Sequence, residues 1–94
     1  YFTAIPSGSL TSAHTGFRFV RGQVTHVGRS RKFIYLEMSP QFALRIGHAD
    51  WQQYFRGRPE EWRGAQIETR GWISEQNGRL HMGIGHPAML QRLP

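Results

Sequence analysis

Residues 33–46, FIYLEMSPQFALRI, decide the fold. Large apolar side chains occupy every second position in two runs, at Ile34, Leu36, Met38, Phe42, Leu44 and Ile46. A period of two is the spacing of side chains along a β-strand with one buried face. The Ser-Pro pair at residues 39–40 separates the runs and favours a tight turn. We therefore predict a β-hairpin with an apolar face and a second face that carries aromatic and charged side chains.

A short helix is predicted directly after this hairpin. In residues 48–55 the spacing changes, and Trp51, Tyr54 and Phe55 stand at positions i, i+3 and i+4. These positions lie on one face of a helix. A glycine and a proline follow soon after, so we expect the helix to end after about two turns.

Three further strands are predicted, one before this unit and two after it. Residues 17–27 alternate between apolar and polar side chains, with a change of phase near Val20 that suggests a bend or a bulge. Residues 67–73 and 80–84 alternate in the same way. The Asn-Gly pair at residues 77–78 lies between them and favours the type I′ turn of a β-hairpin.

The predicted order is strand, strand, strand, short helix, strand, strand, which is the element order of an OB-fold barrel. We therefore predict an all-β fold over residues 17–94, a five-stranded Greek-key OB-fold barrel with one short helix between strands 3 and 4. An SH3-like barrel is the main alternative, but it leaves no place for the helix. Residues 1–16 are rich in small polar side chains and are predicted to form a linker or N-terminal arm. Residues 88–93 could add a final helical turn.

Composition narrows the class of protein. A chain of 94 residues can build one modest core, and its 38% hydrophobic content is typical of a globular domain. The chain begins without methionine, so we expect it to be part of a longer protein. No apolar run is long enough for a membrane-spanning helix. The chain has no cysteine, which excludes disulfides and thiolate metal sites and leaves the compartment open.

The positive charge is unevenly distributed. The net charge is +6, from 12 Lys and Arg against 6 Asp and Glu. Residues 1–36 hold five cations and no acid, whereas acids and cations nearly balance in the remainder. A basic cluster of this kind is typical of proteins that bind a polyanion, which is the interpretation we favour slightly over the alternatives of an arginine-rich composition or plain solubility.

The binding face is predicted from the fold. OB-fold domains bind oligonucleotides across strands 2 and 3 and the loops beside them. Aromatic rings can stack on bases, and arginines can contact phosphates. The predicted nucleic-acid-binding residues are therefore Arg29, Arg31, Lys32, Phe33, Tyr35, Arg45 and Arg79. The alternative is that Phe33 and Tyr35 are covered by the N-terminal arm, by another protein or by a second copy of the chain.

Several stretches resemble a known family. GQVTHV at residues 22–27, FIYL at 33–36, FALRI at 42–46, RGAQIETRGWI at 63–73 and IGHP at 84–87 resemble the OB-type module toward the C-terminus of bacterial thermonuclease-like (staphylococcal-nuclease-related) proteins. The resemblance implies an accessory domain of a nuclease-like protein. The family's Asp-Gly-Asp-Thr and Arg-Leu-x-Gly-Ile-Asp-x-Pro-Glu stretches are absent here, so no catalytic residue is carried over.

No catalytic, metal or cofactor site is predicted. The five histidines are scattered, without the close pairs that zinc sites use. No serine lies in a glycine-rich nucleophile turn, and the chain has no cysteine to act as a nucleophile. We therefore predict a non-catalytic module that binds single-stranded DNA or RNA with little sequence preference. A structural or protein-interaction domain, which includes a homodimer, is the alternative.

Overall fold

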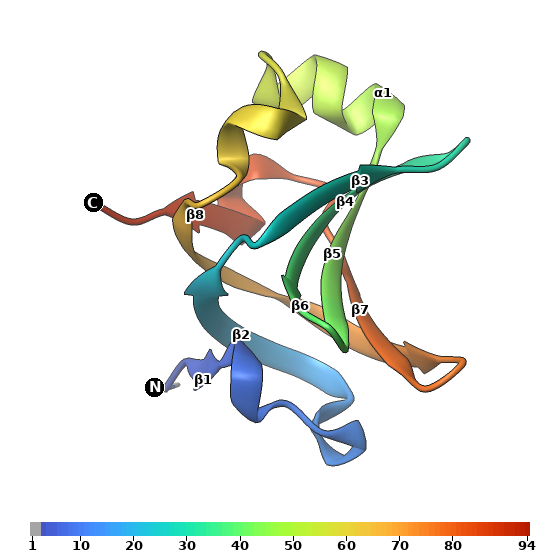
Figure 1. Ribbon diagram of the computed structural model, residues 1–94, viewed down its shortest axis with the longest axis vertical. Coiled ribbons are helices and arrows are strands. Elements are labelled where there is room, and N and C mark those ends of the chain that lie inside the picture. The colour runs from blue at the N-terminus through green and yellow to red at the C-terminus, as the bar shows by residue number, and fades with distance from the viewer. Residues whose placement is uncertain (1–2) are drawn as a thin grey trace.

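The computed structural model describes residues 3–94 and shows a mostly β fold whose strands wrap around a common interior (Figure 1). The strands are β1 (Ile5–Pro6), β2 (Gly16–Gln23), β3 (His26–Arg29), β4 (Phe33–Ser39), β5 (Phe42–Gly47), β6 (Gln66–Gln76), β7 (Arg79–Gly83) and β8 (Leu90–Arg92). The helical segments are α1 (His48–Asp50), the π-helix Trp51–Phe55 and the 3₁₀ turns Ser7–Ser9, Ser12–His14, Pro59–Trp62 and Pro87–Met89.

The strands form one sheet in the order β1-β2-β6-β7-β5-β4-β3, and β8 pairs with β6. The pairs β1–β2 and β5–β7 are parallel, and all others are antiparallel. Within residues 3–94 no strand ladder joins β3 back to β2, so the sheet is not closed. The structure thus confirms the mostly β fold and the short helix after the predicted hairpin. The predicted number of five strands is wrong, because the described residues form eight.

The predicted first strand is divided because the chain changes partner near its middle. β2 pairs with β6, whereas β3 pairs with β4. At the change, the Val24 amide donates to the carbonyl of Ala65 at 2.9 Å, and the Thr25 amide donates to the carbonyl of Glu37 at 2.7 Å. Val24 itself is fully buried. The bend that the change of phase predicted is therefore a crossing from one half of the sheet to the other.

The two remaining extra strands come from the ends of the chain. β1 lies parallel to β2, and β8 replaces the helical turn that was predicted over residues 88–93. Only Pro87–Met89 is helical there. Leu90 is buried and pairs with Thr69, whose hydroxyl donates to the carbonyl of Met89 at 2.9 Å. Burial of an apolar side chain against β6 thus overrides the weak local preference for a helix.

The hairpin formed by β4 and β5 provides much of the core. Its inward side chains are those that the alternation predicted, and all six are at most 4% exposed: Ile34, Leu36, Met38, Phe42, Leu44 and Ile46. On the outer face Tyr35 is opposite Arg45, and Phe33 is opposite Gly47. The same register therefore fixes both the core and the outer face.

The helical segment covers one end of this core. Trp51 is buried, its ring stacks on Phe55 with centroids 5.1 Å apart, and its indole N–H donates to the carbonyl of Gly57 at 3.0 Å. Trp62 packs edge-on against Trp51 at 6.1 Å. Tyr54 lies outside this cluster, is 39% exposed and contacts His86.

The described part of the predicted N-terminal arm lies on the sheet. Ser7 and Leu10 are buried, and β1 pairs with Val20 and Arg21 of β2. Gly22 of β2 lies directly under Ser7, where a side chain would have no room. Residues 1 and 2 of the arm lie outside the described residues.

We predict that Gly22→Ala destabilises the domain by about 1–3 kcal/mol, because overpacking forces neighbouring atoms apart. The new Cβ would overlap the Ser7 side chain and lie 3.0 Å from the terminal methyl of Met38. Urea denaturation measures the effect. Gly8→Ala is the matched control, since its Cβ would meet nothing within 4 Å, and we expect a change of at most about 0.5 kcal/mol. Equal stability of the two variants would contradict the assigned packing of the arm.

Candidate nucleic-acid interface

The outer face of β4 and β5 brings three of the predicted residues together. Phe33 and Tyr35 are half-buried, and their ring centroids lie 6.2 Å apart. Arg45 is the partner of Tyr35 across the hairpin, and its guanidinium carbon lies 4.9 Å from the centre of the Phe33 ring. A guanidinium over an aromatic ring is held by the cation–π attraction. Two aromatic rings and a cation therefore form one continuous surface.

His81 extends this surface onto β7. The parallel pairing of β5 with β7 places His81 beside Ala43, and its ring centroid lies 6.2 Å from that of Tyr35. The small side chain of Ala43 leaves space between the two rings. Sequence reasoning did not include His81 among the site residues. The alternation of residues 80–84 already placed it on the outer face, but the neighbouring strand could not be read from the sequence.

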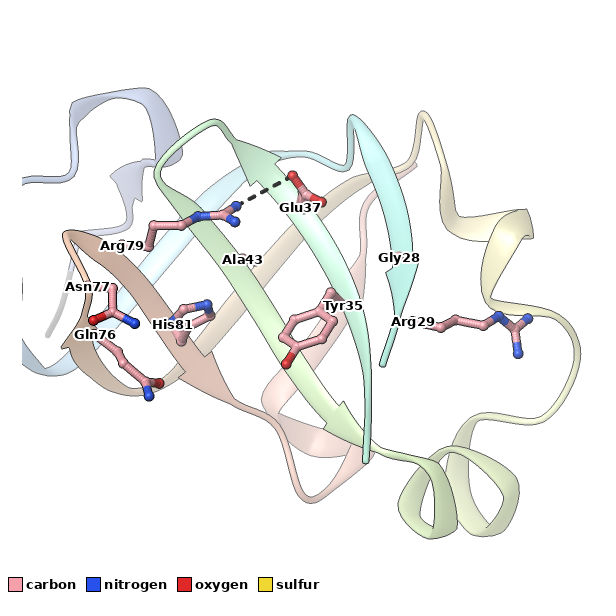
Figure 2. Close-up of a pocket in the computed structure, with 9 residues that line it drawn as sticks. All are labelled: Gly28, Arg29, Tyr35, Glu37, Ala43, Gln76, Asn77, Arg79 and His81. Atoms are coloured by element: carbon pink, nitrogen blue, oxygen red, sulfur yellow. Dashed lines mark ion pairs between the residues drawn. The ribbon is translucent and has the colours of Figure 1, made fainter. Parts of the chain in front are cut away.

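A pocket of about 450 Å³ lies over this region (Figure 2). Tyr35, His81 and Ala43 line its centre, and the hairpin residues Gln76 and Asn77 form one rim. The volume is within the range of small-ligand sites in proteins. The pocket therefore has an aromatic centre and a polar edge.

Arg79 and Glu37 lie close together on one side of the same pocket. Their closest atoms, Nη2 of Arg79 and Oε1 of Glu37, are 3.6 Å apart. Figure 2 shows Arg79 reaching from β7 toward the carboxylate on β4. The structure thus places predicted residue Arg79 at the end of the aromatic surface, together with the acid Glu37.

Arg29 is directed away from the other predicted residues. Its guanidinium donates to both carboxylate oxygens of Glu60, at 2.9 and 2.7 Å, and this hydrogen bonding lowers the pKa of Glu60 below its usual value. In Figure 2 the Arg29 side chain points away from Tyr35 and His81. Its position in the turn region suggested a binding role. The acid that binds it lies 31 residues further along the chain, which local patterns could not reveal.

Arg31 and Lys32 lie in the turn between β3 and β4, next to Phe33. Both are exposed, and neither side chain has an ion pair within residues 3–94. Arg79 lies near Glu37 at the other end of the outer face. From Phe33 to Glu37 the strand extends by roughly 13 Å. Cations therefore stand at both ends of the aromatic surface, and Arg45 stands near its middle.

The environment of His81 keeps its ring neutral near pH 7. Partial burial lowers the pKa of His81 below its usual value of 6.5, and the positive charges of Arg45 and Arg79 lower it further. Its Nδ1 atom is buried, and no residue between 3 and 94 forms a hydrogen bond with it. The neutral ring thus offers an aromatic surface without adding charge to the site.

A second group of aromatic side chains lies on the outside of β2 and β6. Trp72 is 70% exposed and packs edge-on against Phe17, with centroids 6.0 Å apart. Phe17 in turn contacts Phe19 at 5.9 Å. Most of the Trp72 ring is therefore uncovered.

The described residues contain no cluster of metal-ligating side chains. Across residues 3–94, no three His, Asp or Glu side chains lie close enough to hold a metal ion. None of the helices formed by these residues has the length and apolar character needed to cross a membrane.

No protein-family model and no curated protein sequence matches this chain. The geometry of the outer face is therefore the basis for assigning a function.

We predict that the His81 ring titrates with a midpoint below 6.5, the ordinary histidine value, in a pH series of NMR spectra. Arg45→Gln should raise the midpoint, because it removes one of the neighbouring positive charges. Arg63→Gln, an exposed substitution in the turn before β6, should leave it unchanged. Because the pKa is lower in the folded than in the unfolded chain, protonation favours unfolding. The contribution of His81 to stability is therefore full above pH 6.5 and is lost as the pH falls through the folded pKa. A midpoint at or above 6.5 would contradict the described burial.

Proposed function

We propose that this chain is a non-catalytic, nucleic-acid-binding module of the OB-fold barrel type that binds single strands of DNA or RNA. The observation that carries the proposal is the continuous surface of Phe33, Tyr35 and Arg45, with exposed cations in the adjacent turn. Aromatic rings stack on any base, because every base has a π face. Most positions along the strand are therefore bound with little sequence preference.

The element order supports the OB-type assignment. β2 and β3 together correspond to the predicted first strand, and β4, β5, the helical segment, β6 and β7 follow in the predicted order. In OB-fold domains the second and third strands bind oligonucleotides. These strands are β4 and β5, which carry Phe33, Tyr35 and Arg45.

The charges support a strand path along this face. Arg31 and Lys32 are exposed at one end and are free to contact phosphates. Arg29 contributes less, because Glu60 already neutralises it. Each phosphate that a cation neutralises releases counterions, so binding is expected to weaken as salt rises.

We predict that Phe33→Ala combined with Tyr35→Ala weakens the binding of a fluorescent thymidine strand of about 12 nucleotides by at least tenfold. Base stacking on an aromatic ring contributes about 1–3 kcal/mol per base, which corresponds to this loss. Fluorescence anisotropy at about 50 and 200 mM salt measures the affinity. Circular dichroism must show that the double variant is folded, as we expect because both side chains lie on the outer face.

Trp72→Ala is the matched control, since it removes a more exposed aromatic ring that lies outside the pocket. We expect its affinity to equal that of the unaltered chain. If no strand binds at the lower salt concentration, or if Trp72→Ala is the variant that loses binding, the assigned face is wrong.

A second candidate function is that of a structural or protein-interaction domain, and the exposed Trp72 favours it. Large exposed aromatic clusters often mark protein-binding surfaces. The simplest partner is a second copy of this chain, which would bury Trp72 and Phe17 at a symmetric interface. This differs from the homodimer expected from the sequence, in which Phe33 and Tyr35 are buried.

We predict for this candidate that the sedimentation coefficient rises with protein concentration and is insensitive to salt, because apolar contacts are little screened. Trp72→Ala should abolish the rise, whereas Phe33→Ala should not. A monomeric mass at every concentration would rule out self-association through this surface.

A further inference from the structure

We propose that the pocket between β4 and β7 selects guanine at one position of a bound single strand, and this inference rests on the proposed function. The Glu37 carboxylate would accept hydrogen bonds from N1–H and the N2 amino group of guanine. The Arg79 guanidinium would donate to O6 and N7 on the adjoining edge. Tyr35 and His81 would contact the face of the base.

The Glu37 carboxylate is available to a ligand. Among residues 3–94 it accepts no hydrogen bond, and its contact with Arg79 at 3.6 Å is longer than a hydrogen bond. In the ion pairs Arg21–Glu68 and Arg29–Glu60, by contrast, the nearest nitrogen and oxygen atoms are 2.7 Å apart. Glu37 and Arg79 thus lie side by side without a hydrogen bond between them.

The space beside the carboxylate is open. Gly28 of β3 stands opposite Tyr35, and a Cβ built on it would lie 3.9 Å from Oε2 of Glu37. Gly28 and Glu37 both line the pocket, and Oε1 of Glu37 is the oxygen nearest to Arg79. Figure 2 shows Glu37 and Arg79 on one side of the pocket and the Tyr35 and His81 rings beside them. A base that lies on the rings can therefore present two adjoining edges to the two charged groups.

The sign of the charge favours a base over a phosphate at Glu37. A carboxylate repels phosphates, so an acid in the middle of a basic face weakens backbone binding unless it contacts hydrogen-bond donors. Bases offer N–H donors, and carboxylates accept them in known base recognition. Glu37 is thus suited to read a base while Arg31, Lys32 and Arg45 contact the backbone.

Guanine is the base that matches both groups. Its Watson–Crick edge carries two adjacent donors, N1–H and the N2 amino group, which fit the two oxygens of a carboxylate. Next to them stand the acceptors O6 and N7, which arginine binds in a bidentate manner. In adenine and cytosine an acceptor stands next to the amino group, and thymine has one donor between two carbonyls. These bases would leave Glu37 or Arg79 partly unpaired.

The test compares thymidine strands of about 12 nucleotides that carry one central guanine, adenine, cytosine or hypoxanthine. We expect the guanine strand to bind about tenfold more tightly than the all-thymidine strand. Hypoxanthine keeps N1–H, O6 and N7 but lacks the N2 amino group, so its strand should lose most of this advantage. Adenine and cytosine should give none.

Glu37→Gln should remove the guanine preference and leave the affinity for the all-thymidine strand unchanged or slightly higher. Glu75→Gln is the matched control, since Glu75 is exposed on β6 outside the pocket, and it should keep the preference. If Glu37→Gln weakens all strands equally, Glu37 only positions Arg79 and the inference is wrong. It is also wrong if the unaltered chain binds all strands alike, although the proposed function then stands. Binding to none of them overturns both.

Discussion

The crossing of the chain at Val24 and Thr25 is the constraint on which the rest of the structure depends. On one side of it the backbone is bonded to the segment before β6, and on the other side the Thr25 amide is bonded to Glu37 of β4. Burial of Val24 fixes the crossing, because a fully buried side chain leaves the backbone little freedom to slip. β3 therefore lies beside β4 in one register. That register sets Gly28 opposite Tyr35, and both residues line the pocket together with Glu37.

The candidate site follows from strand registers rather than from a motif. Tyr35 faces Arg45 in an antiparallel pair, and Ala43 faces His81 in a parallel pair. Four strands thus place aromatic, basic and small residues on one outer face while their alternate residues fill the core. Because one register sets both faces, a slip by one residue would move the apolar side chains out of the core. The same slip would move the site residues off the outer face. The stability of the domain and its binding surface are consequently coupled.

Much of the local structure could be predicted from the sequence. The β4–β5 hairpin, the helical segment and the Asn77-Gly78 turn depend on neighbours along the chain, and Phe33, Tyr35 and Arg45 come together within one hairpin. The site residues that the sequence assigned wrongly or missed depend on partners that are distant along the chain. Arg29 is bound by Glu60, and His81 joins the site through the β5–β7 pairing. Local sequence patterns identify neighbouring strands only where a short turn joins them, so these distant contacts could not be anticipated.

The basic residues of the turn after β3 also affect how the unpaired edge of the sheet interacts with other chains. β3 ends the path of paired strands, and its outer edge has no strand ladder within residues 3–94. An unpaired edge is a template on which other chains can add a strand and begin to aggregate. Here the edge is four residues long, contains a glycine and ends at Arg29, and the exposed cations Arg31 and Lys32 follow it. Short length and clustered positive charge both discourage edge-to-edge assembly, so these cations also protect the chain from aggregation.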